Sequence, residues 1–348
     1  MNRTDFNGNL RLKDVGREVR LYGWMANRRH LGSLLFVDLR DSTGIVQLTI
    51  PDPSKFPDVR NEYVLYVEGK VSKKEVPNPK LPTGEIEVIV SKLVVLNKAE
   101  NPPFIIADET DALEETRLQY RYLDIRRPIT LSRLKTRAKI AKITREFLDE
   151  NGFLEVETPI LNLATPEGAR DYLVPSRLHH GSFYALPQSP QIFKQLLMVG
   201  GVERYYQIAR CFRDEDLRAD RQPEFTQIDV ETSFFSQDDV LSLCEKMVAR
   251  YFKEILGYEV PLPLRRIDYW DAMDTYGSDK PDTRYGLLIQ DLKELFKASS
   301  FEGFKTARFV KGIVVPSKAK ETSRKNLDAL SMEARKFHLK SLIALKME

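Results

Sequence analysis

The sequence predicts an α+β protein of several domains, in which a small β-barrel is followed by a domain built on a mainly antiparallel sheet. The first hundred residues contain β-type apolar runs separated by turn residues, which is typical of a barrel. The remainder mixes helical and strand patterns without the regular alternation of a parallel sheet. A chain of 348 residues is also too long for one ordinary core and suits two or three domains.

Composition and charge narrow the classes of function. No apolar run is long enough to span a bilayer and no signal-like segment follows Met1, so we expect a cytoplasmic protein outside the membrane. The 54 basic and 51 acidic residues give a net charge of only +3, so binding of nucleic acid must come from local patches. The two cysteines and four histidines lack zinc-ligand spacing, and we predict neither a metal site nor a disulfide framework.

Five apolar runs organise the first domain, residues 1–100. They are Val19–Met25, Leu34–Leu39, Ile45–Ile50, Tyr63–Val71 and Ile86–Leu96. A short segment, Ser54–Arg60, lies between the third and fourth runs, where a five-stranded barrel of the OB type carries its helix, and we therefore predict an OB-fold. The stretch that follows is rich in Asn, Pro, Ala and acids without apolar periodicity, and we assign 101–129 to a linker or hinge.

A long amphipathic helix opens the second domain. Apolar residues recur at helical spacing from Thr130 to Asn151, and Asn151-Gly152 provides a C-terminal stop. The next segment, Phe153–Leu161, is predicted to be a strand, and its Pro159 favours a sheet edge or a strand end. A further helix is predicted over Gln191–Met198.

A charged hairpin runs from Tyr205 to Ser233. Seven of the eleven residues in its loop, 213–223, are charged, and three of these are arginines. On the return strand a period of two places Phe225, Gln227, Asp229 and Glu231 on one face and Thr226, Ile228 and Val230 on the other. Such a wall could hold ATP, because guanidinium groups grip phosphates and an aromatic ring stacks on a base. The alternative is a solvated tip whose mixed charges pair with one another.

The hairpin resembles the second signature motif of class II aminoacyl-tRNA synthetases. The resemblance is carried by Cys211–Glu215 and Arg221–Gln227, in the extended form of the bacterial aspartyl enzymes. It implies that Arg213 is the catalytic residue, holding the α-phosphate of ATP and the substrate carboxylate. The implied ATP-binding residues are Arg213, Asp214, Glu215, Gln222 and Phe225, with Glu215 and Phe225 at the adenine.

Three upstream segments are similar to other parts of the same family. Gly152–Pro159 and the preceding helix resemble the first signature motif, which implies a homodimer interface. Thr165-Pro166-Glu167-Gly168-Ala169-Arg170-Asp171 resembles the mobile loop over bound aspartate, although such a sequence is otherwise only a turn. Pro187–Lys194 resembles the aspartate-recognition element, and the alternative is a helix start with a solvated lysine. The implied aspartate-binding residues are Glu167, Gln191, Lys194, Arg213 and Asp229.

The predicted barrel has its own candidate site. Asn27-Arg28-Arg29-His30 precedes the strand with Phe36, and basic residues beside an aromatic ring suit unstacked bases. The resemblance implies that this barrel reads the anticodon of tRNA-Asp, with Phe36 as the stacking platform. Arg29, Gln47 and Glu87 would lie near the bases. The alternative is that Phe36 belongs to the barrel core.

The resemblance implies an aspartate–tRNA ligase that uses Mg²⁺ and ATP to make aspartyl-adenylate and passes the aspartyl group to tRNA-Asp. It assigns 130–285 to a class II catalytic core with the first and second motifs, and 286–348 to the start of an insertion domain, within which the chain stops. The third motif, a Gly-rich strand and helix ending in an arginine, has no counterpart here. A catalytically silent, tRNA-binding or dimerising fragment therefore remains an alternative. A lysyl- or asparaginyl-type enzyme fits Gln188–Lys194 and the long hairpin loop less well.

Overall fold

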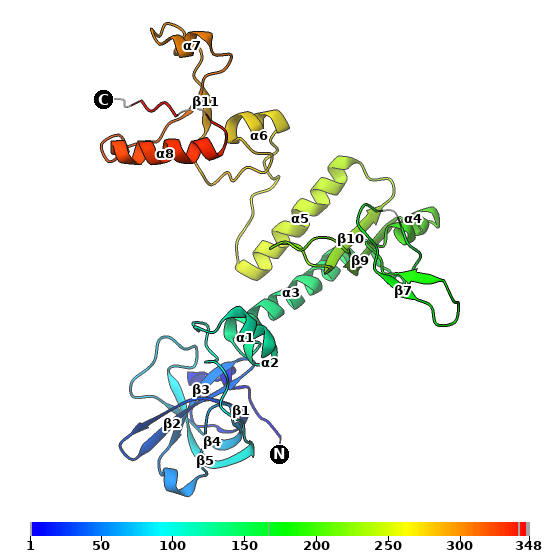
Figure 1. The fold of residues 1–348 in the computed structure, drawn as a ribbon. Coiled ribbons are helices and arrows are strands. Elements are labelled where there is room, and N and C mark those ends of the chain that lie inside the picture. Colours follow the sequence, from blue (N-terminus) through cyan, green and yellow to red (C-terminus); the bar gives the residue numbers. More distant parts are fainter. Residues whose placement is uncertain (1, 166, 340–341, 346–348) are drawn as a thin grey trace. The chain divides into compact units, whose positions relative to one another are not determined.

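The computed structural model describes residues 2–165, 167–339 and 342–345. Its contacts divide the chain into two compact units, Met1–Val260 and Pro261–Glu348 (Figure 1). Pro166 of the predicted mobile loop and residues 340–341 and 346–348 of the predicted tail lie outside the described residues. The division into four segments made from the sequence stays a prediction.

A closed five-stranded barrel forms the N-terminal part of the first unit, as predicted. Its strands are β1 (Glu18–Leu31), β2 (Leu34–Asp41), β3 (Gly44–Ile50), β4 (Val64–Lys73) and β5 (Ile86–Asn97), in the order β1-β2-β3-β5-β4. All neighbouring pairs are antiparallel except β3 and β5, which are parallel. Closure leaves no strand edge open to other chains.

The barrel core follows from the alternation of side chains along each strand. In β2 the apolar residues Leu35, Val37 and Leu39 are buried in the core cluster, while Phe36 and Asp38 point to the outer face and are only partly buried. Gly69 permits close pairing of β4 with β5, because a Cβ atom there would stand 2.4 Å from the Ile89 carbonyl oxygen.

The segment between β3 and β4 corrects one expectation. A helix is expected within Ser54–Arg60, but the structure has only the short 3-10 turn η3 (Pro53–Lys55). Pro53 and Pro57 remove two backbone donors, and the Asp52 carboxylate accepts from Ser54 N at 3.2 Å, which favours a turn.

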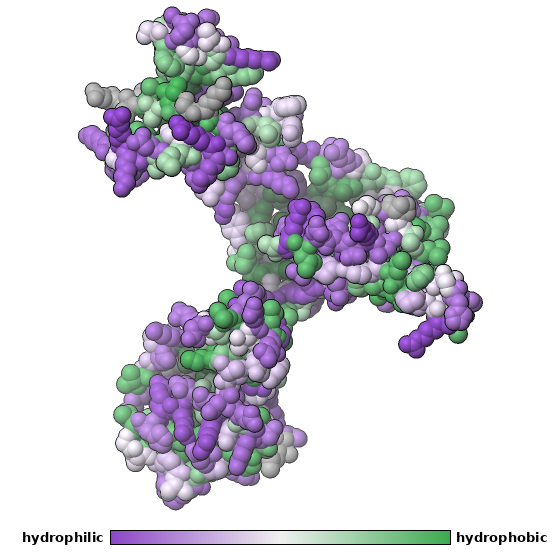
Figure 2. All heavy atoms as spheres, in the orientation of Figure 1, coloured by the Kyte–Doolittle hydropathy of each residue, from purple (hydrophilic) through white to green (hydrophobic). Residues whose placement is uncertain are grey.

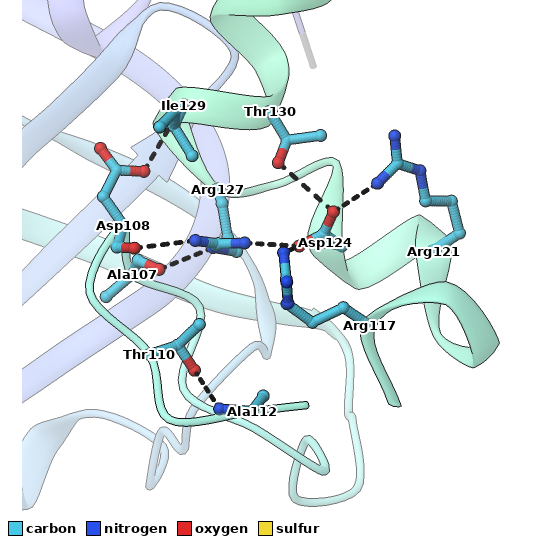
Figure 3. A network of polar contacts seen from close by, with 10 residues as sticks. All are labelled: Ala107, Asp108, Thr110, Ala112, Arg117, Arg121, Asp124, Arg127, Ile129 and Thr130. Atoms are coloured by element: carbon cyan, nitrogen blue, oxygen red, sulfur yellow. Dashed lines mark hydrogen bonds and ion pairs between the residues drawn. The ribbon is translucent and has the colours of Figure 1, made fainter. Parts of the chain in front are cut away.

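The predicted linker contains two short helices, α1 (Glu114–Gln119) and α2 (Arg121–Asp124), organised by one buried carboxylate (Figure 3). Asp124, 1% exposed, lies 2.8 Å from Arg127 Nη1, 2.6 Å from Arg121 Nη1 and 3.9 Å from Arg117 Nη1. Arg127 also donates to the carbonyl oxygens of Ala107 and Asp108, both at 2.7 Å. The network therefore ties the extended part of the linker to the start of the long helix that follows.

The barrel is joined to this linker through a second buried carboxylate. Glu62 lies 2.6 Å from Arg40 of β2 and 2.6 Å from Arg126, which follows α2. The Arg126 guanidinium also sits 4.7 Å from the ring centroid of Trp24. These contacts fix the linker to the barrel wall.

The long helix is α3 (Pro128–Glu150), two residues longer at its start than predicted, and Gly152 follows with a positive φ of 75°. Its buried residues lie at its first turn and in its C-terminal half, whereas 132–139 are all exposed. The helix α5 (Gln237–Leu256) packs on α3, and the two share a small core with the sheet. That core is built from Phe147, Leu148, Phe153 and Tyr206, with Val230, Phe235, Leu243 and Met247 against it.

The sheet of this part has three strands, in the order β10-β9-β6. β9 (Arg204–Phe212) and β10 (Glu224–Thr232) are antiparallel, and β6 (Leu154–Glu155) runs parallel to β9. The predicted strand Phe153–Leu161 is therefore wrong in length. After Val156 N donates to Tyr206 O at 3.1 Å, the chain leaves the ladder toward Pro159, which has no amide hydrogen to offer.

Shorter elements complete the first unit. A small hairpin joins β7 (Leu173–Pro175) to β8 (Phe183–Ala185), and α4 (Gln191–Val199) covers β9 and β10. Apolar side chains reach the surface around α4 and this hairpin, where Figure 2 shows green spheres. They include Leu173, Phe183, Ile192, Leu196 and Val199, which are 44 to 87% exposed.

The second unit is small and loosely packed. Its elements are α6 (Tyr269–Tyr276), β11 (Ile289–Asp291), α7 (Glu302–Thr306), β12 (Lys311–Ile313) and α8 (Arg324–Lys336). β11 and β12 form a two-stranded antiparallel sheet, and among its described residues only Ala272 and Val310 are buried apolar side chains. Across the described part of the chain, no helix combines the length and apolar character needed to cross a membrane.

Candidate functional site

The charged hairpin forms with the register expected from the sequence. β9 and β10 pair continuously from Glu224 opposite Phe212 to Thr232 opposite Arg204. The base of the loop is closed by Arg213 N, which donates to Pro223 O at 2.8 Å. The side chains that alternate along β10 therefore stand on a defined face, opposite Cys211, Ala209 and Gln207 of β9.

One face of the hairpin is a polar wall, as predicted. Phe225, Gln227, Asp229 and Glu231 share it. The Cys211 thiol lies 3.1 Å from Gln227 Oε1, and burial, reinforced by the nearby Asp229, raises its pKa to about 11. The thiol is therefore neutral and can donate. The opposite face is only partly buried, since Ile228 is 37% exposed and Thr226 accepts from Arg137 at 2.6 Å.

Arg213 and Phe225 meet at the top of this wall. The Arg213 guanidinium carbon lies 5.1 Å from the centroid of the Phe225 ring, which holds the cation over an aromatic face. Arg213 Nε is buried and finds no acceptor among the described residues. An oriented guanidinium with an unused buried donor suits a bound oxyanion, because each unmet buried donor is costly in the free protein.

The tip of the loop is solvated and partly self-paired. Arg221 Nη1 lies 3.5 Å from Glu215 Oε2, with the two side chains 53% and 38% exposed. Asp214 donates its backbone amide to Arg170 O at 3.0 Å, and Gln222 is exposed. The structure therefore brings Arg213 and Phe225 together, but leaves the predicted ATP contacts of Glu215 and Gln222 at the surface.

Lys194 of α4 reaches the lower part of the wall. Its ammonium lies 2.8 Å from Asp229 Oδ1 and 3.3 Å from Glu231 Oε2. Burial opposes the charge, but these two carboxylates outweigh it, and the pKa of Lys194 lies above its ordinary value. An ammonium has three hydrogens, so one remains after both carboxylates are served. The alternative of a solvated lysine is wrong, since Lys194 is 8% exposed.

The turn that contains Glu167 and Arg170 lies next to the polar wall. Ser189 Oγ donates to Glu167 Oε2 at 2.7 Å, and the backbone amide of Asp214 donates to Arg170 O. Gln191, three residues before Lys194 in α4, is half-buried. Glu167, Lys194, Asp229 and Arg213 are thus carried by neighbouring elements, although among the described residues no hydrogen bond or ion pair joins Glu167 to Lys194.

Sequence reasoning missed Gln188 as a member of this site. The side chain is 1% exposed and hydrogen-bonded to Ala169 and Asp171 of the turn. The sequence offers no signal for this burial, because the partners of Gln188 are a carboxylate and backbone atoms of a turn 17 or more residues away.

An open cavity of about 570 Å³ lies beside β9, where β6 stops pairing. It is lined by residues that include Arg145, Glu155, Thr158, Pro187, Gln207 and Arg210. Its lining includes Gln207 and Ala209, which pair with Asp229 and Gln227 of the polar wall, but none of the predicted site residues. Among the described side chains, no group of three or more His, Cys, Asp or Glu could hold a metal ion.

A second polar cluster occupies the outer face of the barrel. Arg29 of β1 pairs with Phe36 of β2, and Arg29 Nη2 donates to Gln47 Oε1 at 3.5 Å. Gln47 Nε2 donates in turn to Glu87 Oε2 at 3.1 Å. The four predicted base-binding residues are therefore gathered on one face. The alternative that Phe36 is barrel core is wrong, because its ring lies outside the core cluster.

Three further residues of this outer face escaped prediction. Thr49 donates to Glu87, and Asp38 lies 3.7 Å from Arg29. Burial lowers the pKa of Lys74 in spite of Glu87 and Asp38, and burial raises that of Asp38. Lys74 is one of a pair with Lys73, and nothing in the sequence separates the buried lysine from the exposed one.

A closed five-stranded barrel joined to a domain in which an antiparallel hairpin holds an arginine over an aromatic ring defines the structural class of this protein. Comparison with known families is specific. The model described as tRNA synthetases class II (D, K and N) matches residues 113–337, and that of the OB-fold nucleic acid binding domain matches 19–96. The chain belongs to the class II tRNA synthetases of the D, K and N group.

Individual relatives agree with this family. The chain is 55% identical over 358 residues to a protein of Geobacillus sp. (strain WCH70) named aspartate–tRNA(Asp/Asn) ligase, covering 99% of the chain and 60% of that relative. It is 50% identical to the aspartate–tRNA ligase of Lactobacillus acidophilus, covering 99% of the chain and 58% of that relative. The chain thus spans about 60% of the length of the curated relatives it matches.

A solved structure has the same arrangement. The asparaginyl-tRNA synthetase from Pyrococcus horikoshii, complexed with asparaginyl-adenylate, aligns with a TM-score of 0.65 at 27% identity. The alignment covers 74% of this chain and 60% of that one. The antiparallel hairpin and the barrel are therefore parts of a known architecture.

Proposed function

We propose that this chain carries the aspartate- and ATP-binding part of an aspartate–tRNA ligase, which activates aspartate with ATP and transfers it to tRNA-Asp. The observation that carries the proposal is the wall of β10, where Arg213 over Phe225 stands above the buried Lys194 and Asp229. The names of the relatives support aspartate as the amino acid.

In the proposed first step, the α-carboxylate of aspartate attacks the α-phosphorus of ATP. A bond forms between a carboxylate oxygen and the α-phosphorus. The bond from the α-phosphorus to the oxygen that bridges it to the β-phosphorus breaks, and pyrophosphate leaves with the negative charge. Arg213 would hold the α-phosphate and the α-carboxylate together, so the catalysis comes from positioning and from charge stabilisation rather than from a protein nucleophile. Phe225 would stack on adenine, with Asp214, Glu215 and Gln222 completing the ATP site.

The aspartate side chain would be held by Lys194. Its remaining N–H can donate to the substrate carboxylate, while Asp229 and Glu231 keep the ammonium charged. Glu167 would accept from the amino group, and Gln191 would line the same side. Asparagine would offer a neutral amide to a site arranged around a buried cation, which is the basis for discrimination.

Magnesium would arrive with ATP and offset charge on its phosphates when bound. In the second step the terminal ribose hydroxyl of tRNA-Asp attacks the aspartyl carbonyl and an ester forms. The bond from this carbonyl to the phosphate breaks, and AMP leaves with the hydroxyl proton on its phosphate. The outer face of the barrel, with Arg29, Phe36, Gln47 and Glu87, would bind the anticodon. The exposed N-terminal half of α3 would form a homodimer interface, and the protein would act in the cytoplasm.

A second candidate is a fragment that binds tRNA or dimerises without activating aspartate. It is favoured by the outer face of the barrel, where Arg29, Phe36, Gln47 and Glu87 lie together apart from the aspartate-binding wall. Aspartate-dependent exchange of labelled pyrophosphate into ATP separates the two. Exchange by the purified chain supports the ligase, and tRNA-Asp binding without exchange supports the fragment.

The same assay tests the site. Arg213→Ala should abolish exchange while leaving the circular dichroism spectrum and the unfolding midpoint close to those of the unchanged chain. Arg335→Ala, on the exposed face of α8, is the matched control and should exchange at the unchanged rate. Equal exchange by the two variants would remove Arg213 from the mechanism.

A further inference from the structure

Gln188 has an unusual set of partners for a buried glutamine. All the hydrogen bonds of its side-chain amide go to one turn, formed by Thr165 and 167–171. Nε2 donates to Asp171 Oδ1 at 2.6 Å and to Ala169 O at 3.0 Å, with Thr165 O also within 3.3 Å. Oε1 accepts from Ala169 N at 3.2 Å. Both amide hydrogens and the carbonyl oxygen are therefore used on this turn.

The backbone beside Gln188 is fixed to the polar wall. Pro187 O accepts from Phe212 N at 2.9 Å, at the end of β9. Within the turn that Gln188 holds, Arg170 O accepts from Asp214 N at 3.0 Å. The two residues that flank Arg213 are thus tied to the segment of Gln188 and to the turn that Gln188 holds. A shift of the turn would be felt at Arg213.

The same turn carries Glu167. The amide of Glu167 donates to Thr165 O at 2.9 Å, and its carboxylate accepts from Ser189 Oγ at 2.7 Å, one residue after Gln188. The Asp171 carboxylate accepts from Thr165 N at 3.2 Å, which closes the turn on itself. Without the Gln188 amide, this carboxylate would keep only that backbone donor, and Ala169 would lose both of its partners.

We propose that Gln188 is a positioning residue, which rests on the proposed function: its amide holds the turn so that Glu167 and Arg213 keep one fixed arrangement around bound aspartate. Gln188 acts through the turn and does not touch the substrate. The Gln188 side chain is buried from solvent, so water cannot replace the hydrogen bonds that a substitution removes.

The first test is amide hydrogen exchange on the full chain without ligand. Gln188→Met keeps the length of the side chain but removes all of its hydrogen bonds. We expect exchange at Ala169 and in the peptide 163–172 to become about tenfold faster, since lost hydrogen bonds of this kind permit local opening. Protection of β9 and β10 should stay unchanged, which shows that the fold is intact. Unchanged exchange at Ala169 would overturn the inference.

A matched control and an exchange of partners sharpen this test. Gln119→Met, at the exposed end of α1, makes the same chemical change where no turn depends on it.

Gln188→Glu places a carboxylate against Asp171 and should loosen the turn further. The double variant Gln188→Glu, Asp171→Asn restores a donor and an acceptor between the two positions and should recover part of the protection. Failure of the double variant to recover any protection would contradict a specific pairing.

The second test measures positioning. The probe is the non-hydrolysable sulfamoyl analogue of aspartyl-adenylate, titrated by calorimetry into the full chain. Gln188→Met should weaken binding of the analogue about tenfold, because the loss of the hydrogen bonds that hold Glu167 and Arg213 in place is worth about one such factor. Equal analogue affinity would overturn the inference. No analogue binding by the unchanged chain would count against the proposed function, and hydrogen exchange would still decide whether the amide holds the turn.

Discussion

Lys194 Nζ lies 2.8 Å from Asp229 Oδ1, and both residues are only 8% exposed. The pair joins α4 to β10 in the lower part of the polar wall, and Glu231 adds a second carboxylate at 3.3 Å. Asp229 Oδ2 is buried and has no partner among the described residues. A buried ion pair with an unused acceptor is poorly justified by stability alone, but it keeps a charged ammonium ready at a site for a carboxylate.

The first prediction concerns the loss of this ammonium. Lys194→Met leaves Asp229 buried without its cation, and breaking a buried pair on one side costs about 3–5 kcal/mol. We therefore expect the free energy of unfolding to fall by about that amount in urea denaturation, with an unchanged dependence on urea. The variant should also lose aspartate-dependent pyrophosphate exchange.

Lys142→Met is the control for this change. Lys142 pairs with Glu146 one helical turn away at 3.6 Å, but its side chain is 73% exposed. Exposed pairs of this spacing contribute about 0.5 kcal/mol or less. Equal losses for the two variants would show that the Lys194 pair is as weak as a surface pair.

The second prediction concerns pH and the thiol of Cys211. Burial, with Asp229 nearby, raises its pKa from 9.0 to about 11. A raised pKa contributes stability that is complete below pH 9 and is lost as the pH rises toward 11, because the unfolded chain releases the proton first. Cys211→Ser keeps a donor to Gln227 but does not titrate in this range, so the wild-type chain should lose about 2 kcal/mol more than this variant between pH 8 and 10.5.

Alkylation gives an independent reading of the same thiol. Cys244 is exposed and Cys211 is buried. At pH 8, iodoacetamide should modify Cys244 in the folded chain and reach Cys211 only after unfolding. Comparable alkylation rates at the two positions would contradict the burial of Cys211.

The barrel was predictable because its signal is local. Five apolar runs at a period of two produce five strands, and closure follows from their number and order. The same period explains why Phe36 lies outside while Val37 lies inside, although this could not be decided before the phase of β2 was known. The role of Lys74 could not be predicted, because the carboxylates that oppose the effect of its burial, Asp38 and Glu87, come from distant parts of the sequence.

The second part of the first unit was predicted less completely. The hairpin and its polar face follow from alternation, but β6 is two residues long, because a strand's length depends on its neighbour in the sheet. The linker was read as irregular, since α1 and α2 have few apolar residues and are held by Asp124 instead. Gln188 was not recognised as a site residue because its partners are backbone atoms and one carboxylate in a turn 17 or more residues away.

The third prediction concerns Asp124. Burial alone would raise the pKa of its carboxyl, but Arg127 and Arg121 outweigh burial and the pKa lies below the ordinary 3.8. The stabilisation is therefore present above pH 3.8 and lost as the pH falls through the lower, folded-state pKa. Asp124→Asn removes the charge that the arginines share (Figure 3), and the free energy of unfolding should fall by about 3–5 kcal/mol at pH 7.

Asp282→Asn provides the comparison for Asp124→Asn. Asp282 also pairs with an arginine, but Arg284 is 84% exposed and the pair joins residues two apart in a loop. Its removal should leave the free energy of unfolding nearly unchanged, since solvent and salt screen such a pair. If Asp124→Asn proved equally mild, the linker would not depend on its buried carboxylate.

The fourth prediction separates binding from folding in the barrel. Phe36 stands on the outer face between Arg29 and Thr49 of the neighbouring strands, so its ring is available to stack on a base. Phe36→Ala should weaken tRNA-Asp binding by about 1–3 kcal/mol, which corresponds to about 5- to 150-fold in affinity, with little change in unfolding. Val37→Ala should do the reverse, because Val37 is fully buried in the core and its truncation leaves a cavity. Filter binding and urea denaturation of both variants test the pair together. A Phe36→Ala chain that binds tRNA-Asp unchanged, or that loses as much stability as Val37→Ala, would place Phe36 among the structural residues and remove it from the anticodon site.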